Sequence, residues 1–367
     1  MRRNTHERVI LMLIKPWTAV FWKWALLVCA WCICCGESSA HECRRDTTRN
    51  TLQTKSVIDM AGRRVTVPRS IGRIATVGAV PVLNSYLFTL GEGKEIINGL
   101  PYFTPAKWRM QIAVAPHLAG QPVLQSQNRT INIEMLLRIR PDVVITMDTS
   151  ALKSLEKIGI PVIFLEWGDV SDIKANMKLL GHVLGRTSRS DEYLRYFETT
   201  INRVHRTLSG RAKNSSPKVL FCNPNSLTVP LPITEWWIRE AGGQSVTAGM
   251  SESKTGSYSH EQIFLWNPDI VLVSAPEQIA RVYGDKRLMR VKAVLNKRVY
   301  AMPVGTHPWG QRTVEQPLTV LWAAKLFFPD RFRKVSMENE VRAFYRRFFN
   351  YELSGKEVRW ILTGGAQ

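Results

Sequence analysis

The sequence predicts an α/β protein made of two similar lobes with a ligand cleft between them. The first observation is a repeated segment, INIEMLLRIRPDVVI at 131–145 and YSHEQIFLWNPDIVLV at 258–273. Each copy has a Glu, a short apolar turn of helix, Pro-Asp and a β-branched run, and these three residues recur 127 positions apart. So long a period indicates two related lobes rather than a solenoid. The second observation is an alternation of strand and helix patterns, which indicates mostly parallel sheets.

Alternating apolar residues and turn signals define the elements of the first lobe. Apolar residues alternate on both sides of Ala61-Gly62-Arg63, which predicts a hairpin with its turn there. Gly91 and Gly159 follow apolar helical patterns, as glycine does where helices end. In chain order the expected elements are a hairpin (57–68), a strand (73–77), a helix (81–90), a strand (94–98), a helix (131–139), a strand (142–147), a helix (151–158) and a strand (161–165).

A long amphipathic pattern separates the two lobes and predicts a helix that joins them. Between 191 and 208, apolar side chains recur at three- and four-residue spacings, with Ser190 or Asp191 as the cap. A helix at 172–184 precedes it, and the second lobe has expected elements at 218–222, 234–241, 269–274, 298–302, 314–328 and 332–349. The expected organisation is a leader (1–40), a flexible segment (41–56), an N-terminal lobe (57–185), an interlobe helix (186–213), a C-terminal lobe (214–350) and a tail (351–367).

The first forty residues have the pattern of an export signal. A basic start precedes an apolar stretch from Trp24 to Cys35, and Ser38 and Ala40 stand where a small-x-small cleavage site belongs. The apolar stretch is shorter than the roughly 20 residues of a spanning helix. We expect export and cleavage after Ala40, with an uncleaved anchor as the alternative.

Four of the six cysteines lie within this apolar leader, so we interpret them as small apolar residues rather than a metal cluster. Lipid attachment to one of them stays open. Outside the leader only Cys43 and Cys222 remain, and we expect two free thiols rather than a disulfide.

The net charge of the chain and the motifs that it lacks exclude several classes of function. A formal net charge of +20 suits nucleic acid, an anionic membrane surface or an anionic small ligand. The chain has no run of five like charges and is expected to be exported, so we exclude a nucleic-acid partner. The sequence has no GxGxxG, P-loop or GxSxG motif, and His260-Glu261 lacks a second His because residue 264 is Phe264. We therefore expect no enzyme activity and no cofactor.

An ordered set of segments gives a family resemblance. DxxGRxVxVP, LFTLG, NIExLLRIRPDVVI, GIPV, KVLF, EAGG, HEQIFLWNPDIVLV and RVYAMP follow one another across roughly 57–330. This set resembles the periplasmic substrate-binding proteins of ABC importers for ferric siderophores, haem and corrinoids. The resemblance implies two Rossmann-like lobes joined by a single long helix, with the ligand between them and little hinge motion.

The same resemblance implies a partner surface. Members of the family have an exposed Glu on each lobe that docks onto arginines of the permease, and Glu134 and Glu261 match those positions. Each Glu also opens a helical segment, where the helix dipole alone would stabilise a carboxylate by about 0.3–1 kcal/mol. Ser85 departs from the pattern, because many members have Glu there.

The ligand should be held by loops at the carboxyl ends of the strands, where open α/β sheets bind their ligands. The resemblance implies aromatic platforms at Tyr102 and Trp309, since stacking contributes about 0.5–1.5 kcal/mol per ring pair. The planar guanidinium groups of Arg129 and Arg312 suit a carboxylate or a catecholate, although Arg312 also has Glu315 nearby in sequence as a possible partner. The full set of expected ligand-binding residues is Tyr102, Trp108, Arg129, Tyr258, His260, His307, Trp309 and Arg312.

These features predict an extracytoplasmic solute-binding protein that captures a metal chelate and delivers it to an ABC permease and its ATPase. Ferric siderophore, haem and corrinoid are the expected cargoes. A nickel–histidine chelate is an alternative, since His260 and His307 can bind a metal with an open coordination site. A bare divalent metal would need three or four converging ligands, and an enzyme or an exported structural protein fits the duplication less well. Which chelate binds, and the oligomeric state, stay open.

Overall fold

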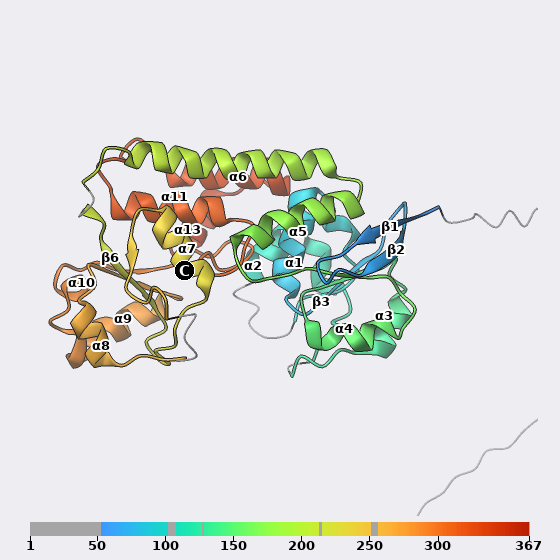
Figure 1. Ribbon diagram of the computed structural model, residues 1–367, viewed down its shortest axis with the longest axis horizontal. Helices are drawn as coiled ribbons and strands as arrows, with labels where there is room; N and C mark the ends of the chain where they lie inside the picture. Colours follow the sequence, from blue (N-terminus) through green and yellow to red (C-terminus); the bar gives the residue numbers. More distant parts are fainter. Residues whose placement is uncertain (1–52, 102–107, 127, 213–214, 251–255, 367) are drawn as a thin grey trace, which may run out of the picture. The chain divides into compact units, whose positions relative to one another are not determined.

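Two parallel sheets organise the part of the chain that the computed structural model describes, residues 53–101, 108–126, 128–212, 215–250 and 256–366 (Figure 1). The first sheet has the order β3 (Ile74–Val77), β4 (Val143–Thr146), β5 (Val162–Phe164). The second has the order β7 (Gln244–Ser245), β6 (Lys218–Cys222), β8 (Ile270–Val273), β9 (Val299–Ala301). Every pair within them is parallel, which confirms the predicted α/β class.

All but one of the elements predicted for the first lobe are present. The hairpin β1 (Thr54–Ile58) and β2 (Arg64–Pro68) is antiparallel, as expected. The strand predicted at 94–98 is wrong, because η1 (Gly93–Glu95) occupies its start and Ile96 makes only an isolated bridge to Ile74. The Asn98 side chain takes over at this edge, accepting from the Thr76 amide at 2.7 Å and donating to its carbonyl at 3.1 Å. A side-chain amide thus replaces further ladder bonds.

The repeated segment forms the same unit in both lobes. It begins with α3 (Ile133–Ile139) in the first lobe and α8 (His260–Trp266) in the second, and it continues into β4 and β8. Asn132 caps α3 by accepting from the Met135 amide at 2.9 Å, and Ser259 caps α8 by accepting from the Gln262 amide at 3.3 Å. A polar N-cap of this kind satisfies an amide that has no partner within the helix.

The long helix α6 (Thr187–Leu208) packs against elements of both lobes, α5 (Val170–Val183) on one side and α11 (Gln316–Phe327) on the other. It begins earlier than predicted, and Ser190 is not its cap. Ser190 is instead within the first turn of α6, and its hydroxyl donates to the Met177 carbonyl of α5 at 3.0 Å. This close crossing requires Gly181, since a Cβ there would lie 2.6 Å from Ser190 Cβ.

The C-terminal residues add a further helical layer. The helix predicted at 332–349 is α12 (Met337–Phe344) followed by the π-helical turn η6 (Tyr345–Phe349). The residues predicted as a tail contain α13 (Gly355–Leu362), whose Trp360 and Ile361 are buried. Ser354 and Glu357 form a capping box that starts this helix, a signal that the sequence prediction did not use.

The remaining helices cover the sheets and connect them. They are α1 (Val80–Leu90), α2 (Arg109–Val114), η3 (Pro116–Gly120), α4 (Thr149–Glu156), α7 (Pro232–Glu240), α9 (Glu277–Gly284), η5 (Lys286–Leu288) and α10 (Lys292–Leu295). Among the residues described, no helix combines the length and apolar character that crossing a membrane requires.

Candidate functional site

The carboxyl ends of strands from both sheets meet in one region. Residues that follow β6 and β8, including Asn223 and Ser274, line a hollow of about 280 Å³ together with Gln311. The next residue, Arg312, places its guanidinium 5.0 Å from the ring centre of Trp167, which follows β5 of the first lobe. This is the edge at which parallel α/β sheets bind ligands. We therefore take this region as the candidate site.

Two predicted residues from opposite lobes, Arg129 and Arg312, both add positive charge to this region. Burial is the main cause that lowers the pKa of Arg312, and the positive charge of Arg129 lowers it further. Neither has an ion-pair partner among the residues that the structure describes, so Arg312 does not pair with Glu315. Two positive charges in one region without a carboxylate partner form a site that an anion would stabilise.

A buried polar floor lies next to this arginine pair. The hydroxyl of Tyr86 and Oδ1 of Asn176 are both buried, and among the described residues neither has a hydrogen-bond partner. Burial raises the pKa of Tyr86, while the nearby Asn176 side chain and the charge of Arg312 act in the opposite direction. The Asn176 amide nitrogen is fixed by donating to the Glu166 carbonyl at 2.8 Å. The Tyr86 hydroxyl and the Asn176 carboxamide thus lie near each other and form a buried polar group close to the positive charge of Arg312.

Trp108 and His307 lie together, but as a contact between the lobes. Their rings stack with centroids 5.8 Å apart and an interplanar angle of 18°, and each residue is only 8% exposed. Burial lowers the pKa of His307 to about 3, with a further contribution from Arg312, so the imidazole is neutral at pH 7. Next to this pair, Gln111 donates to the Thr306 carbonyl at 2.9 Å. The Trp108–His307 stack and the Gln111–Thr306 hydrogen bond are therefore contacts that stabilise the packing of one lobe against the other.

Trp309 and Tyr258 do not line the site. Trp309 has no exposed surface, since its ring packs into the main core, so the prediction of an open stacking platform is wrong for this ring. Tyr258 is 5% exposed and packs edge-on against Trp266 within the second lobe. Both side chains stabilise the lobe that carries the loops. Tyr102, the other predicted platform, lies outside the described residues.

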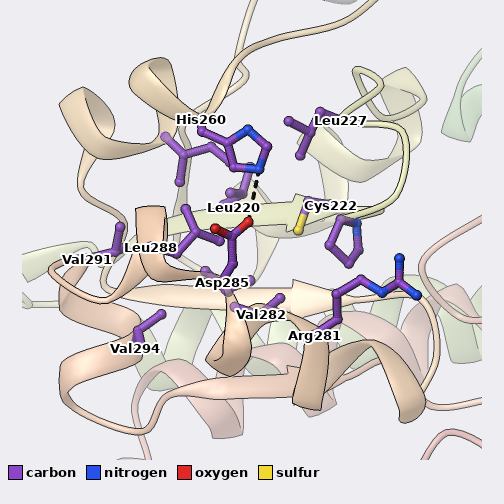
Figure 2. A pocket seen from close by; sticks show the side chains of 13 residues that line it. Leu220, Cys222, Leu227, His260, Arg281, Val282, Asp285, Leu288, Val291 and Val294 are labelled. Carbon is purple, nitrogen blue, oxygen red and sulfur yellow. Dashed lines mark ion pairs between the residues drawn. The ribbon is translucent and has the colours of Figure 1, made fainter.

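His260 belongs to a separate cavity inside the second lobe. Figure 2 shows its ring among Leu220, Cys222 and other apolar side chains, with Nε2 paired to Asp285 at 3.2 Å. Hydrogen bonds from Arg287 are the main cause that lowers the pKa of Asp285 to about 2. The cavity volume of about 10 Å³ holds at most one water molecule. We therefore regard His260 as a structural residue and correct its predicted role at the ligand.

The histidines do not form a shared metal centre. His117 bonds to the Ile96 carbonyl at 3.1 Å and His205 pairs with Glu240 at 2.8 Å, while His260 and His307 occupy the two environments described above. Across the described ranges, no three His, Cys, Asp or Glu side chains are grouped in a way that would hold a metal ion. The donor set of the candidate site is cationic and neutral instead.

Sequence reasoning missed Trp167, Tyr86 and Asn176. Trp167 lies two residues after the predicted strand 161–165, so the rule that selected the other loops, the carboxyl ends of strands, would have found it. Tyr86 is in α1, which is buried on all sides, and Asn176 is on the buried face of α5. For both, the sequence did contain a signal of a buried polar site, namely a polar side chain within an otherwise apolar helical pattern.

Comparisons with known proteins agree on the family. A family model described as periplasmic binding protein matches residues 104–304. The chain is 24% identical over 327 residues to the molybdate-binding protein MolA of Haemophilus influenzae, covering 82% of this chain and 92% of that protein. The structure of MolA bound to molybdate is similar with a TM-score of 0.71 at 23% identity, covering 82% of this chain and 99% of that one.

Two further solved structures extend the comparison. A periplasmic solute-binding protein from Veillonella parvula is 27% identical with a TM-score of 0.73, covering 84% of this chain and 97% of that one. Helicobacter pylori CeuE in complex with Ni-His is 18% identical with a TM-score of 0.67, covering 84% and 99%. The shared fold thus serves cargoes of different chemistry.

Proposed function

This chain belongs to the periplasmic binding protein family, whose members bind solutes for transport and are not enzymes, and we propose that it captures an anionic, metal-containing solute. It delivers this cargo to an ABC permease and its ATPase outside the cytoplasm. The export leader at 1–40, the N-terminal lobe at 57–185 and the C-terminal lobe at 214–350 are part of the same proposal.

The observation that carries the proposal is the positive charge of Arg129 and Arg312, which have no ion-pair partner among the described residues. An uncompensated pair of positive charges favours an anion, and a guanidinium presents parallel donors that match oxyanion and carboxylate geometry. Trp167 offers an apolar face below Arg312, and the Tyr86 hydroxyl adds a hydrogen-bonding group. A bare divalent cation would be repelled from such a site, so we place that alternative last.

The cargo class that fits this site best is a metal oxyanion such as molybdate, the ligand named for MolA. An oxyanion needs donors on several sides, which the guanidinium groups of Arg129 and Arg312 supply, and the hollow of about 280 Å³ that begins at Gln311, next to Arg312 in the chain, is large enough for it. An anionic chelate is the second candidate, either ferric siderophore, haem or corrinoid, and the ring of Trp167 favours it. Ni-His, the ligand named for CeuE, has less need of a cationic pair.

Delivery requires a surface for the permease, and we assign it to Glu134 and Glu261. Both carboxylates are exposed in the first turns of α3 and α8, at equivalent positions of the repeated unit. The Ser259 hydroxyl is the main cause that lowers the pKa of Glu261, which keeps this carboxylate charged. In Figure 1 both helices lie at the bottom of the view, away from α6 at the top.

Calorimetric titration of purified 41–367 tests the cargo. Molybdate, tungstate, sulfate, a ferric siderophore, haem, cobalamin and nickel–histidine are added in turn. We expect saturable binding of an anionic metal species, and Arg129→Gln and Arg312→Gln should each weaken it by about 2 kcal/mol, or roughly thirtyfold in Kd. Arg195→Gln, on the exposed face of α6, is the matched control. Unchanged affinity in both cleft variants would refute the proposed site.

A further inference from the structure

Two exposed apolar side chains occupy equivalent positions in the two lobes. Leu137 of α3 is 46% exposed and Phe264 of α8 is 50% exposed, and they lie 127 positions apart, as Glu134 and Glu261 do. Single apolar side chains on a surface are ordinary. Recurrence of an exposed apolar side chain at one repeat position is different, because only four of the fifteen positions are identical between 131–145 and 258–272, namely the Glu, the Pro, the Asp and one Val. The two copies diverge in sequence yet keep the same kind of surface.

Helix geometry puts each apolar side chain beside the carboxylate. Residues three apart on a helix are neighbours on one face, so Leu137 adjoins Glu134 and Phe264 adjoins Glu261. The opposite faces are fixed by Leu136 and Ile263, which are 0% and 1% exposed. Each helix therefore presents one carboxylate and one apolar side chain outward in a defined orientation. We call these the α3 patch (Glu134, Leu137) and the α8 patch (Glu261, Phe264).

We propose that Leu137 and Phe264 are apolar anchors of the permease interface, each seated next to the docking Glu of its patch. This inference rests on the proposed function. The partner it describes is an ABC permease with two equivalent extracytoplasmic surfaces, each presenting a basic side chain beside an apolar pocket. A pair of like patches on one chain is matched by a partner with two-fold symmetry or two like subunits.

The negative charge of Glu134 and Glu261 favours a permease at the two patches over a second copy of the chain or an anionic membrane surface. A second copy of the chain would bring Glu134 or Glu261 against another of these carboxylates, which is unfavourable. An anionic membrane surface would meet the carboxylates first, although the chain as a whole has a net charge of +20. A basic and apolar protein surface complements both features of each patch.

The α8 patch should contribute more than the α3 patch. Phe264 is larger than Leu137, and its neighbour Leu265 is 78% exposed where the first lobe has Arg138. Burial of apolar area stabilises an interface in proportion to the area removed from water. We therefore expect the larger loss of permease affinity on truncating Phe264.

The test measures permease binding and cargo binding on the same variants. The permease complex in nanodiscs is titrated with the protein carrying Leu137→Ser, Phe264→Ser or both, and cargo affinity is measured separately. We expect about fivefold weaker permease binding for Leu137→Ser, about tenfold for Phe264→Ser and a larger loss for both, with cargo affinity unchanged. Leu295→Ser, on α10 and 64% exposed, is the matched control and should stay within twofold.

Three outcomes overturn the inference. The first is unchanged permease affinity in the double Ser variant while Glu134→Arg with Glu261→Arg abolishes docking, which leaves the proposed function standing. The second is a loss of affinity for protein-free anionic vesicles, in the double Ser variant, that is as large as its loss of affinity for the permease. This result would make the patches a lipid contact. The third is retention of permease binding by both the Ser and the Arg pairs, which removes the docking surface from the proposed function as well.

Discussion

The two copies of the repeated unit share a backbone and differ in what their loops contribute. Arg140 ends α3 and Asn267 ends α8, both with left-handed backbone at φ 46° and 47°. In the loop before each helix, by contrast, the first lobe has Arg129 where the second has Gly256. The second guanidinium comes from Arg312, in a different loop. The scaffold is thus repeated, while the side chains that we propose for ligand binding are specific to each lobe.

The Asp after each proline shows how the shared backbone is anchored. Asp142 accepts from the amides of Gly72 and Arg73 at 2.8 and 2.9 Å, which joins β4 to the start of β3. Asp269 accepts from the Lys218 amide at 2.8 Å, which joins β8 to the start of β6. The repeat therefore conserves a strand-to-strand anchor, with two bonds in one lobe and one in the other.

The largest expected effect is on the buried apolar residue of each helix. Leu136→Ala and Ile263→Ala should each lower the free energy of unfolding by about 3 kcal/mol, because each leaves a cavity in its lobe. The adjacent exposed residues give matched controls, since Leu137→Ala and Phe264→Ala should change stability by about 0.5 kcal/mol or less. Urea unfolding followed by circular dichroism measures all four. A lower free energy of unfolding for only one of the two variants, Leu136→Ala or Ile263→Ala, would show that the two units are not packed alike.

The anchoring Asp residues should differ between the lobes. Asp142→Ala should cost about 2 kcal/mol and Asp269→Ala about 1 kcal/mol, because the first removes two hydrogen bonds to a charged acceptor and the second removes one. Asp330→Ala, an exposed residue, serves as the control. The midpoints of urea unfolding give the order. A greater loss from Asp269→Ala would contradict the bond count.

An effect of similar size to those of the two Asp variants concerns the contact between the lobes and depends on pH. The pKa of buried His307 is lowered to about 3, so the unfolded state, with an ordinary pKa near 6.5, binds the proton that the folded state does not. Stability from this group is therefore present above about pH 6.5 and is lost as the pH falls towards 3. Going from pH 7.5 to 5.5 should cost about 1.4 kcal/mol.

His307→Gln isolates this contribution, because Gln carries no charge in this range. Urea unfolding at both pH values should show a smaller pH dependence in the variant, by about the same 1.4 kcal/mol. An identical pH dependence in both proteins would show that the imidazole takes up a proton in the folded state, and that the stacked contact with Trp108 is not the tight one described.

Much of the scaffold could be predicted because it depends on local patterns. Apolar periodicity and β-branched runs are each contained in a few neighbouring residues, and they predicted the long helix and most of the strands. Two such segments, 127 positions apart, identified the two lobes. The strand predicted at 94–98 failed because Asn98 bonds to Thr76 through its side chain, a long-range contact that no local pattern contains. The capping box of α13 is local and was available, but was not used.

The site was predictable only in part, for a similar reason. Arg129 and Arg312 were predicted because loops at the carboxyl ends of strands line the cleft of an α/β protein, and their role at the ligand stays a prediction. Trp309 belongs to such a loop as well, but its ring is fully buried in the main core. Whether a loop ring faces the cleft or the core is decided by packing between distant segments, which the sequence does not display.

The most direct test of the account is to locate the metal in a crystal of the protein with its tightest cargo, using anomalous scattering. The account predicts one metal position between the guanidinium groups of Arg129 and Arg312, above the ring of Trp167. A metal bound at the His260–Asp285 cavity, or anywhere that leaves both arginines without contact to the cargo, would contradict it.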